Sequence, residues 1–132
     1  MTLLGICRWL YVAACALVVS CSYAKAQALP GQPMAFLGYC QLTSLGSSTA
    51  LASCSGGIPT GSNAVLLKAE AQALRYRPDG ATTAPTATVG MPIATADAPL
   101  LIQSGSTGLA ALRFIEQTSG GKLNILFYRA PQ

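Results

Sequence analysis

The sequence predicts a small all-β domain, either an antiparallel sandwich or a jelly-roll-like barrel of about six to eight short strands, preceded by a leader helix. Short apolar runs recur along the 132-residue chain at a spacing of about 8–15 residues. Turn-forming residues separate these runs, and 13 glycines and 8 prolines supply much of that punctuation. The length allows one domain after the leader, which we place at residues 34–132, behind a linker at 29–33.

The first strand is expected at Met34–Leu42, with aromatic anchors at Phe36 and Tyr39. A long loop of low charge follows at 44–62 and ends in strong glycine and proline punctuation. Another short apolar strand is expected at Pro99–Gln103.

The segment from Ala64 to Arg77 fits two structures. Its alanine, leucine, glutamate and glutamine residues favour a helix, whereas Lys68 and Glu70 alternate with apolar neighbours as in a strand. We choose the strand because turns flank the segment, the second of them at Pro78–Gly80. Prolines exclude a helix over Ala81–Val89, which we expect to form a surface strand, either held within its own sheet or available to another chain.

A β-hairpin is the clearest expectation. After a tight loop at 104–108, the strand-like runs Leu109–Gln117 and Lys122–Arg129 flank the sequence Thr-Ser-Gly-Gly. Alternation along both runs predicts a shared core face, and burying each of its side chains is worth roughly 1.5–3 kcal/mol. That core face consists of Leu112, Phe114, Leu123, Ile125 and Phe127.

Residues 1–28 read as a signal-peptide-like leader. Arg8 precedes the apolar run Trp9–Val19, and Ala24–Ala26 forms an A-x-A cleavage pattern. The run is too short for a comfortable permanent membrane anchor, so the mature domain is expected to be secreted or periplasmic rather than transmembrane.

Two alternatives to simple cleavage remain open. Val18-Val19-Ser20-Cys21 resembles a bacterial lipoprotein box, which would make Cys21 a lipidation site. Translation could instead begin at Met34, in which case the argument for export falls away.

Cys40 and Cys54 are the two cysteines of the domain. In an oxidising compartment they would pair, and a bridge closing a loop of about 15 residues contributes roughly 3 kcal/mol. The alternative is two buried free thiols in a cytosolic protein. Two cysteines without histidine do not complete a tetrahedral zinc shell, so no metal site is expected.

The composition argues against an enzyme. The chain has no histidine, which excludes Ser-His-Asp and Cys-His chemistry, and it has no nucleotide-binding or nucleophile-elbow motif. Only four carboxylates are available, and they lie in unlike sequence contexts. We therefore expect no catalytic residues and no cofactor.

The charge balance argues against nucleic acid as a partner, since residues from Gln27 onward carry a net charge of only +2. Lys68, Arg75, Tyr76 and Arg77 could form a basic-aromatic interaction surface of the kind that binds single strands. The preferred interpretation is a solvated strand face with the tyrosine packed among its neighbours.

Four segments carry a resemblance to a known family: AEAQALRYRPDG, APTATVGMPI, ALRFIEQ and KLNILFYR. Together they resemble small proteins encoded in the structural regions of tailed phages and prophages, which often carry the pattern RxRDDG…PTAxxGxPL…LxFI. The resemblance covers about residues 64–129. This sequence departs from the pattern in two ways. Pro78 stands where the pattern has the first aspartate of the turn, and a leader precedes the domain.

The resemblance implies a non-catalytic, virion-associated β-domain, such as a head decoration or tail accessory protein. Its partners would be proteins, either other virion or envelope proteins or further copies in a homo-oligomer. The alternative is an exported periplasmic or lipid-anchored β-domain that binds a protein or a glycan.

Overall fold

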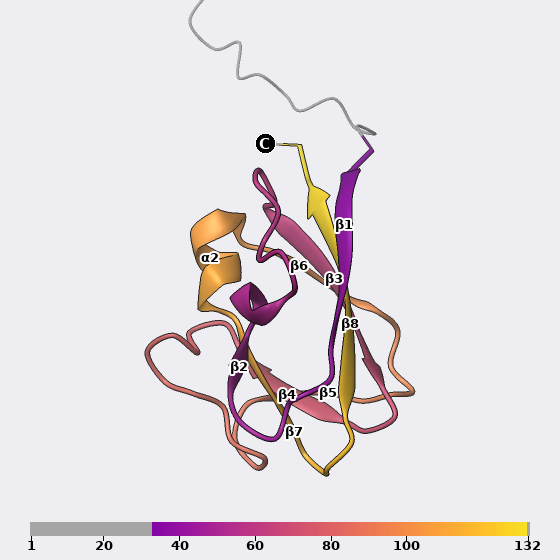
Figure 1. Cartoon of the computed structure of the whole chain (residues 1–132), viewed down its shortest axis with the longest axis vertical. Coiled ribbons are helices and arrows are strands. Elements are labelled where there is room, and N and C mark those ends of the chain that lie inside the picture. The colour runs from indigo at the N-terminus through magenta and orange to yellow at the C-terminus, as the bar shows by residue number, and fades with distance from the viewer. Residues whose placement is uncertain (1–32, 132) are drawn as a thin grey trace, which may run out of the picture. The chain divides into compact units, whose positions relative to one another are not determined.

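The computed structural model describes residues 33–131. These residues form two four-stranded antiparallel sheets, arranged like a sandwich, and one short α-helix (Figure 1). The prediction of a mostly β, sandwich-like domain is thereby confirmed, and the short helix is an addition to it. The predicted leader helix, its cleavage site and the possible lipidation site Cys21 lie outside the described residues.

Each sheet joins strands from distant parts of the chain. The first sheet has the order β1 (Ala35–Leu42), β8 (Lys122–Arg129), β3 (Ala64–Glu70) and β6 (Leu100–Gln103). The second has the order β2 (Thr49–Ala50), β7 (Arg113–Glu116), β4 (Leu74–Arg77) and β5 (Met91–Ile93). The short helices are η2 (Leu51–Ser53) and α2 (Gly105–Ala111). The pairing follows the pattern of one long hairpin that is folded over on itself. β1 pairs with β8, β2 with β7, β3 with β6 and β4 with β5.

The core lies between the two sheets. Along β8, from Lys122 to Tyr128, buried and half-buried side chains alternate, as expected for a strand with one face against a core. All five side chains predicted for the core face are at most 1% exposed, which confirms that expectation. Leu45 and Leu51, from the segment between β1 and β3, are also fully buried, so this connection contributes to the core.

The predicted β-hairpin is wrong. β7 and β8 are consecutive in the chain, yet they belong to different sheets. The Thr-Ser-Gly-Gly loop carries the chain across the sandwich, and the Glu116 carboxylate accepts a hydrogen bond from the Gly121 N–H at 2.8 Å. At the same end of the loop the Gln117 N–H donates to the carbonyl oxygen of Ala73 at 3.0 Å. These bonds direct the chain to the opposite sheet.

The strand chosen for residues 64–77 is confirmed, but it is two strands in different sheets. β3 ends at Glu70 and β4 begins at Leu74. The chain changes sheet at Ala71, the one described non-glycine residue with positive φ, at 68°. Both crossings lie at one end of the domain, because Lys122 pairs with Glu70 in one sheet and Glu116 pairs with Leu74 in the other.

Three further segments differ from expectation. The first three residues of the predicted strand Leu109–Gln117 belong instead to α2, whose alanines favour a helix and whose Leu109 is fully buried. Residues 81–89 form turns rather than a strand, since Thr86 and Val89 exchange backbone hydrogen bonds with each other. The predicted loop 44–62 contains β2 and η2.

Candidate interaction surface

The outer face of the first sheet carries a row of apolar side chains that crosses all four strands. Side chains alternate along a strand, so the neighbours of the buried residues point outward. The register places Leu126 opposite Tyr39 on one side and Leu66 on the other, and Leu101 opposite Leu66. We call these four residues, Tyr39, Leu126, Leu66 and Leu101, the apolar row.

Both ends of the apolar row are open to solvent. Tyr39 is 58% exposed and Leu101 is 41% exposed, whereas the two leucines between them are half-buried. Beside Tyr39 the ring of Phe36, 59% exposed, meets the ring of Tyr128 edge-on with centroids 5.9 Å apart. Aromatic and aliphatic groups therefore share one outward-facing surface.

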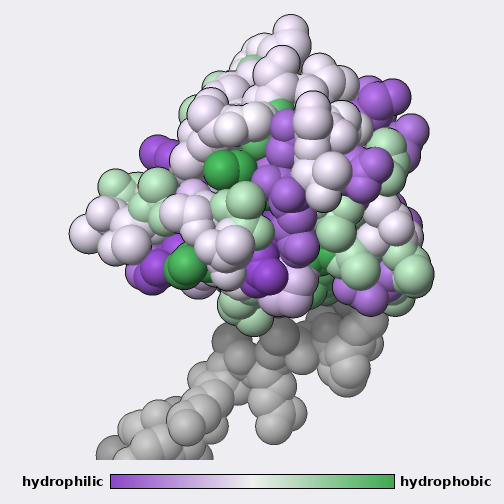
Figure 2. Space-filling model, turned by 90° about the horizontal axis from the view of Figure 1, so that it is seen from below, coloured by the Kyte–Doolittle hydropathy of each residue, from purple (hydrophilic) through white to green (hydrophobic). Residues whose placement is uncertain are grey.

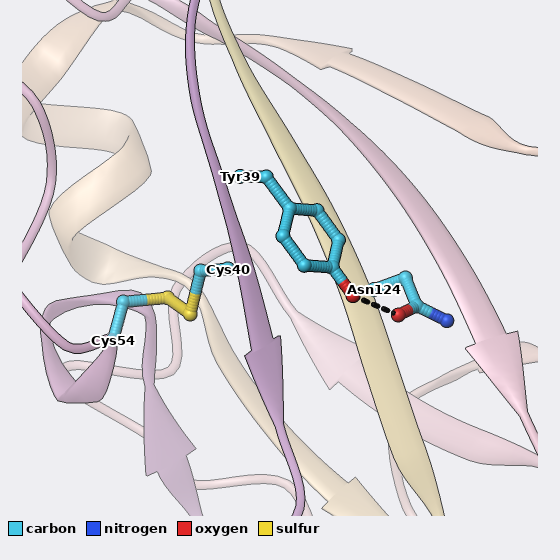
Figure 3. The surroundings of a disulfide bond; sticks show 4 residues. All are labelled: Tyr39, Cys40, Cys54 and Asn124. Carbon is cyan, nitrogen blue, oxygen red and sulfur yellow. Dashed lines mark hydrogen bonds between the residues drawn. A yellow bond between two sulfur atoms is a disulfide. The ribbon is translucent and has the colours of Figure 1, made fainter.

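A polar network borders the apolar row. The Tyr39 hydroxyl donates to the Asn124 side-chain oxygen at 2.7 Å, and Gln41 Nε2 donates to the same oxygen at 2.9 Å. Asn124 Nδ2 in turn donates to a Glu70 carboxylate oxygen at 2.8 Å. Figure 3 shows the Tyr39 ring lying across β8 toward Asn124. These bonds hold the exposed tyrosine in place.

The disulfide predicted between Cys40 and Cys54 is present, with Cα atoms 5.9 Å apart. Tyr39 and Cys40 are neighbours on β1 and point to opposite sides of it, as Figure 3 shows. Both sulfur-bearing residues are buried, at 8% and 5% exposed. The bridge therefore fixes β1 to the segment after η2 from the core side and leaves the outer face uncovered.

The predicted basic-aromatic set, Lys68, Arg75, Tyr76 and Arg77, does not lie on one surface. Lys68 belongs to the first sheet, where its Nζ donates to the carbonyl oxygens of Thr95, at 2.8 Å, and Asp97. The other three belong to β4 in the second sheet, because the chain crosses the sandwich between them and Lys68.

Tyr76 is only 7% exposed and stacks on Phe114, with ring centroids 6.4 Å apart. Strand alternation turns its side chain inward, while Arg75 and Arg77 face outward. The tyrosine is therefore part of the core, as in the interpretation that places it among its packed neighbours, and the two arginines lack an aromatic partner between them.

Arg75 and Arg77 hold the chain after β4. The Arg75 guanidinium donates to the carbonyl oxygens of Ala87 at 3.0 Å and Gly90 at 2.8 Å. Arg77 makes two hydrogen bonds to the Asp79 carboxylate, at 2.8 and 2.6 Å. These hydrogen bonds lower the pKa of Asp79 from its ordinary value. Both arginines therefore have a structural role in the segment that follows β4.

The four carboxylates lie in separate settings. Glu70 joins the polar network, Asp79 pairs with Arg77, the Asp97 carboxylate accepts from the Ala94 N–H, and Glu116 accepts from Gly121. Among residues 33–131 no three histidine, cysteine, aspartate or glutamate side chains gather where they could hold a metal ion.

A depression of about 600 Å³ lies where β3 and β8 meet the chain ends of the domain. Its lining includes Gly61, Ser62, Asn63 and Arg129, and no carboxylate. The Ser62 hydroxyl is buried without a hydrogen-bond partner in the described part of the chain. Asn63 exchanges two hydrogen bonds with the Ala130 backbone, so it is committed to closing this end of the sandwich.

The end of the domain that carries the β7–β8 loop has no comparable apolar patch. Figure 2 shows hydrophilic and hydrophobic residues interspersed over this face. No helix in the described residues is long and apolar enough to cross a membrane. The apolar row makes the outer face of the first sheet our candidate contact surface.

Comparisons of the chain with protein-family models, with curated proteins and with solved structures find no match.

Proposed function

We propose that this domain is a non-catalytic structural or interaction protein, an accessory component of a phage or prophage virion that acts by contact through the first sheet. The observation that carries the proposal is the apolar row, with two exposed ends on one sheet face. Contiguous exposed apolar surface marks interaction sites on soluble proteins. Covering it with a partner gains roughly 25 cal/mol for each Å² of apolar surface removed from water.

The strand orders support the virion setting. In our interpretation the orders β1-β8-β3-β6 and β2-β7-β4-β5 form a jelly roll, the double-sheet arrangement that occurs in viral capsid and lectin domains. A fold alone does not define a function, so the proposal rests on the apolar row, and the fold and the phage-like pattern add to it.

Co-purification with particles from the native source tests the proposal. We expect the wild-type protein to sediment with particles, and the double variant Leu66→Lys/Leu126→Lys to remain in the soluble fraction. Met91→Lys is the matched control, because Met91 is 54% exposed and lies on the second sheet. Circular dichroism checks that each variant is folded.

Two outcomes would contradict this proposal. A wild-type protein that never accompanies particles removes the virion setting. A folded Leu66→Lys/Leu126→Lys variant that accompanies particles as well as the wild type removes the apolar row as the contact surface.

The Cys40–Cys54 disulfide favours a second candidate, an exported periplasmic or lipid-anchored domain that binds a protein or a glycan. Disulfides persist in oxidising compartments and are rare in the cytosol. Fractionation and mass spectrometry of the mature N-terminus separate the two candidates. A start after Ala26 or Ala28, or a lipidated Cys21, supports export, whereas a start at Met34 supports the cytoplasmic assembly of a virion protein.

A further inference from the structure

The four edge strands of the two sheets differ greatly in how well they are protected from pairing with another chain. In the second sheet β2 has two residues, and β5 has three with Pro92 at its centre. In the first sheet β6 has four residues, whereas β1 has eight. Short strands and prolines are the usual means of preventing an edge from pairing with another chain. β1 is therefore the edge with the greatest capacity to pair.

The composition of β1 provides no further protection. Ala35–Leu42 contains no charged residue and no proline. A β-bulge between Phe36 and Gly38, a feature that hinders pairing of an edge, affects one end of the strand and leaves Gly38–Leu42 as a regular ladder. Within residues 33–131 the main chain of β1 makes no backbone hydrogen bond except to β8. An exposed edge of this kind is a template for a further strand.

We propose that β1 pairs antiparallel with β1 of a second copy of this chain, so that two four-stranded sheets become one continuous sheet. A two-fold axis places this strand opposite itself, and an uncharged strand does so without bringing like charges together. The pairing also brings the exposed Tyr39 of each copy to the new junction, where cross-strand aromatic contacts stabilise a sheet.

Side chains on the outer face next to the β1 edge are compatible with a second copy of this chain as the pairing partner. The apolar row ends at β1 with Tyr39, so in the register that sets Tyr39 opposite Tyr39 this row would continue into the partner's sheet. The pairing uses the main chain of the β1 edge and does not depend on the proposed function.

The mass in solution of the protein made from the full sequence tests the pairing. We expect light scattering to give two chains for the wild type and one chain for Tyr39→Lys/Gln41→Lys, which places charges at the edge. Leu101→Lys is the matched control, because β6 is the opposite edge of the same sheet. The control should remain a dimer, and the double variant should dissociate at least about tenfold more readily, since every 1.4 kcal/mol is a factor of ten.

Hydrogen exchange identifies the surface used. In the dimer every amide from Gly38 to Leu42 should be protected, whereas in the double variant alternate amides should exchange freely because a free edge points every second N–H at solvent. Circular dichroism and the intact disulfide report that the variant is folded.

The pairing is refuted by a wild-type protein that remains a single chain at its highest soluble concentration, or by a Tyr39→Lys/Gln41→Lys protein that stays dimeric. A dimer whose alternate β1 amides still exchange freely uses another surface and also refutes it, as does a stable complex with a different protein along β1. Particle association is measured separately, so failure of the edge pairing and failure of the proposed function can be distinguished.

Discussion

The guanidinium of Arg75 donates a hydrogen bond to the carbonyl oxygen of Gly90 at 2.8 Å, and this bond fastens the loop after β4 back onto the strand. A second bond, from Arg75 to Ala87, holds the same loop at another point. Gly90 has a φ of 131°, and a Cβ there would lie 3.0 Å from the carbonyl oxygen of Tyr76. The close approach of loop and strand therefore needs both the arginine and the glycine.

Removing the Arg75 guanidinium should loosen this loop. We expect Arg75→Met to lower the free energy of unfolding by about 1–2 kcal/mol, because hydrogen bonds from a charged donor are worth about 1.5–3 kcal/mol and this side chain is partly exposed. Limited proteolysis should then cut between residues 81 and 90 first. Arg129→Met is the control, since within residues 33–131 the Arg129 side chain makes a single hydrogen bond, which is long, at 3.4 Å to the carbonyl oxygen of Gly61. Its loss should change stability by less than about 0.5 kcal/mol. Equal losses in the two variants would contradict this account.

The positive φ of Ala71 predicts a stabilising substitution. A side chain in the left-handed region costs about 1–2 kcal/mol, which glycine avoids at the expense of greater freedom in the unfolded chain. We therefore expect Ala71→Gly to raise the free energy of unfolding by about 0.5–1 kcal/mol in urea titrations. Ala73→Gly, two residues away without a positive φ, should instead be neutral or destabilising. A destabilised Ala71→Gly protein would show that the Ala71 side chain makes a stabilising contact.

Loss of the Cys40–Cys54 bridge should destabilise the domain strongly. Its sequence separation of 14 corresponds to a loss of about 3 kcal/mol in the chain-entropy model. The double variant Cys40→Ala/Cys54→Ala and the reduced wild type should show similarly lowered denaturant midpoints, and reductant should not lower that of the double variant further. Mass spectrometry provides the direct check, because two alkylatable thiols in native, unreduced protein would rule the bridge out.

Asp79 should titrate below its ordinary range. Hydrogen bonds from Arg77 lower its pKa from 3.8, so the ionised form of Asp79 is stabilised in the folded state relative to the unfolded state. The stabilisation is therefore present above pH 3.8 and is lost as the pH falls through the lower pKa of the folded protein. Carbon-detected NMR titration should show the Asp79 pKa returning toward 3.8 in Arg77→Met. An Asp79 pKa that is the same in both proteins would contradict the assignment of Arg77 as the cause.

The sequence alone predicted a mostly β domain, the pairing of Cys40 with Cys54 in an oxidising compartment, and five of the side chains that form the core. Alternation along Lys122–Arg129 predicted which side chains are buried, because a strand with one face against the core buries every second side chain. The same rule places Tyr76 inward and Arg75 and Arg77 outward once β4 is known to be a strand. Local periodicity was therefore sufficient to predict which side chains of a single strand face the core.

Tertiary structure alone decided which strands pair. The Gly-Gly loop before β8 looks like a hairpin turn, and the alanine-rich link before β4 looks like the middle of one strand. Both carry the chain between sheets, and each is held by a residue distant in sequence or by an unusual φ. The apolar row was likewise invisible in the sequence, since Tyr39, Leu66, Leu101 and Leu126 come from four separated strands. Long-range register joins them, and no local pattern encodes it.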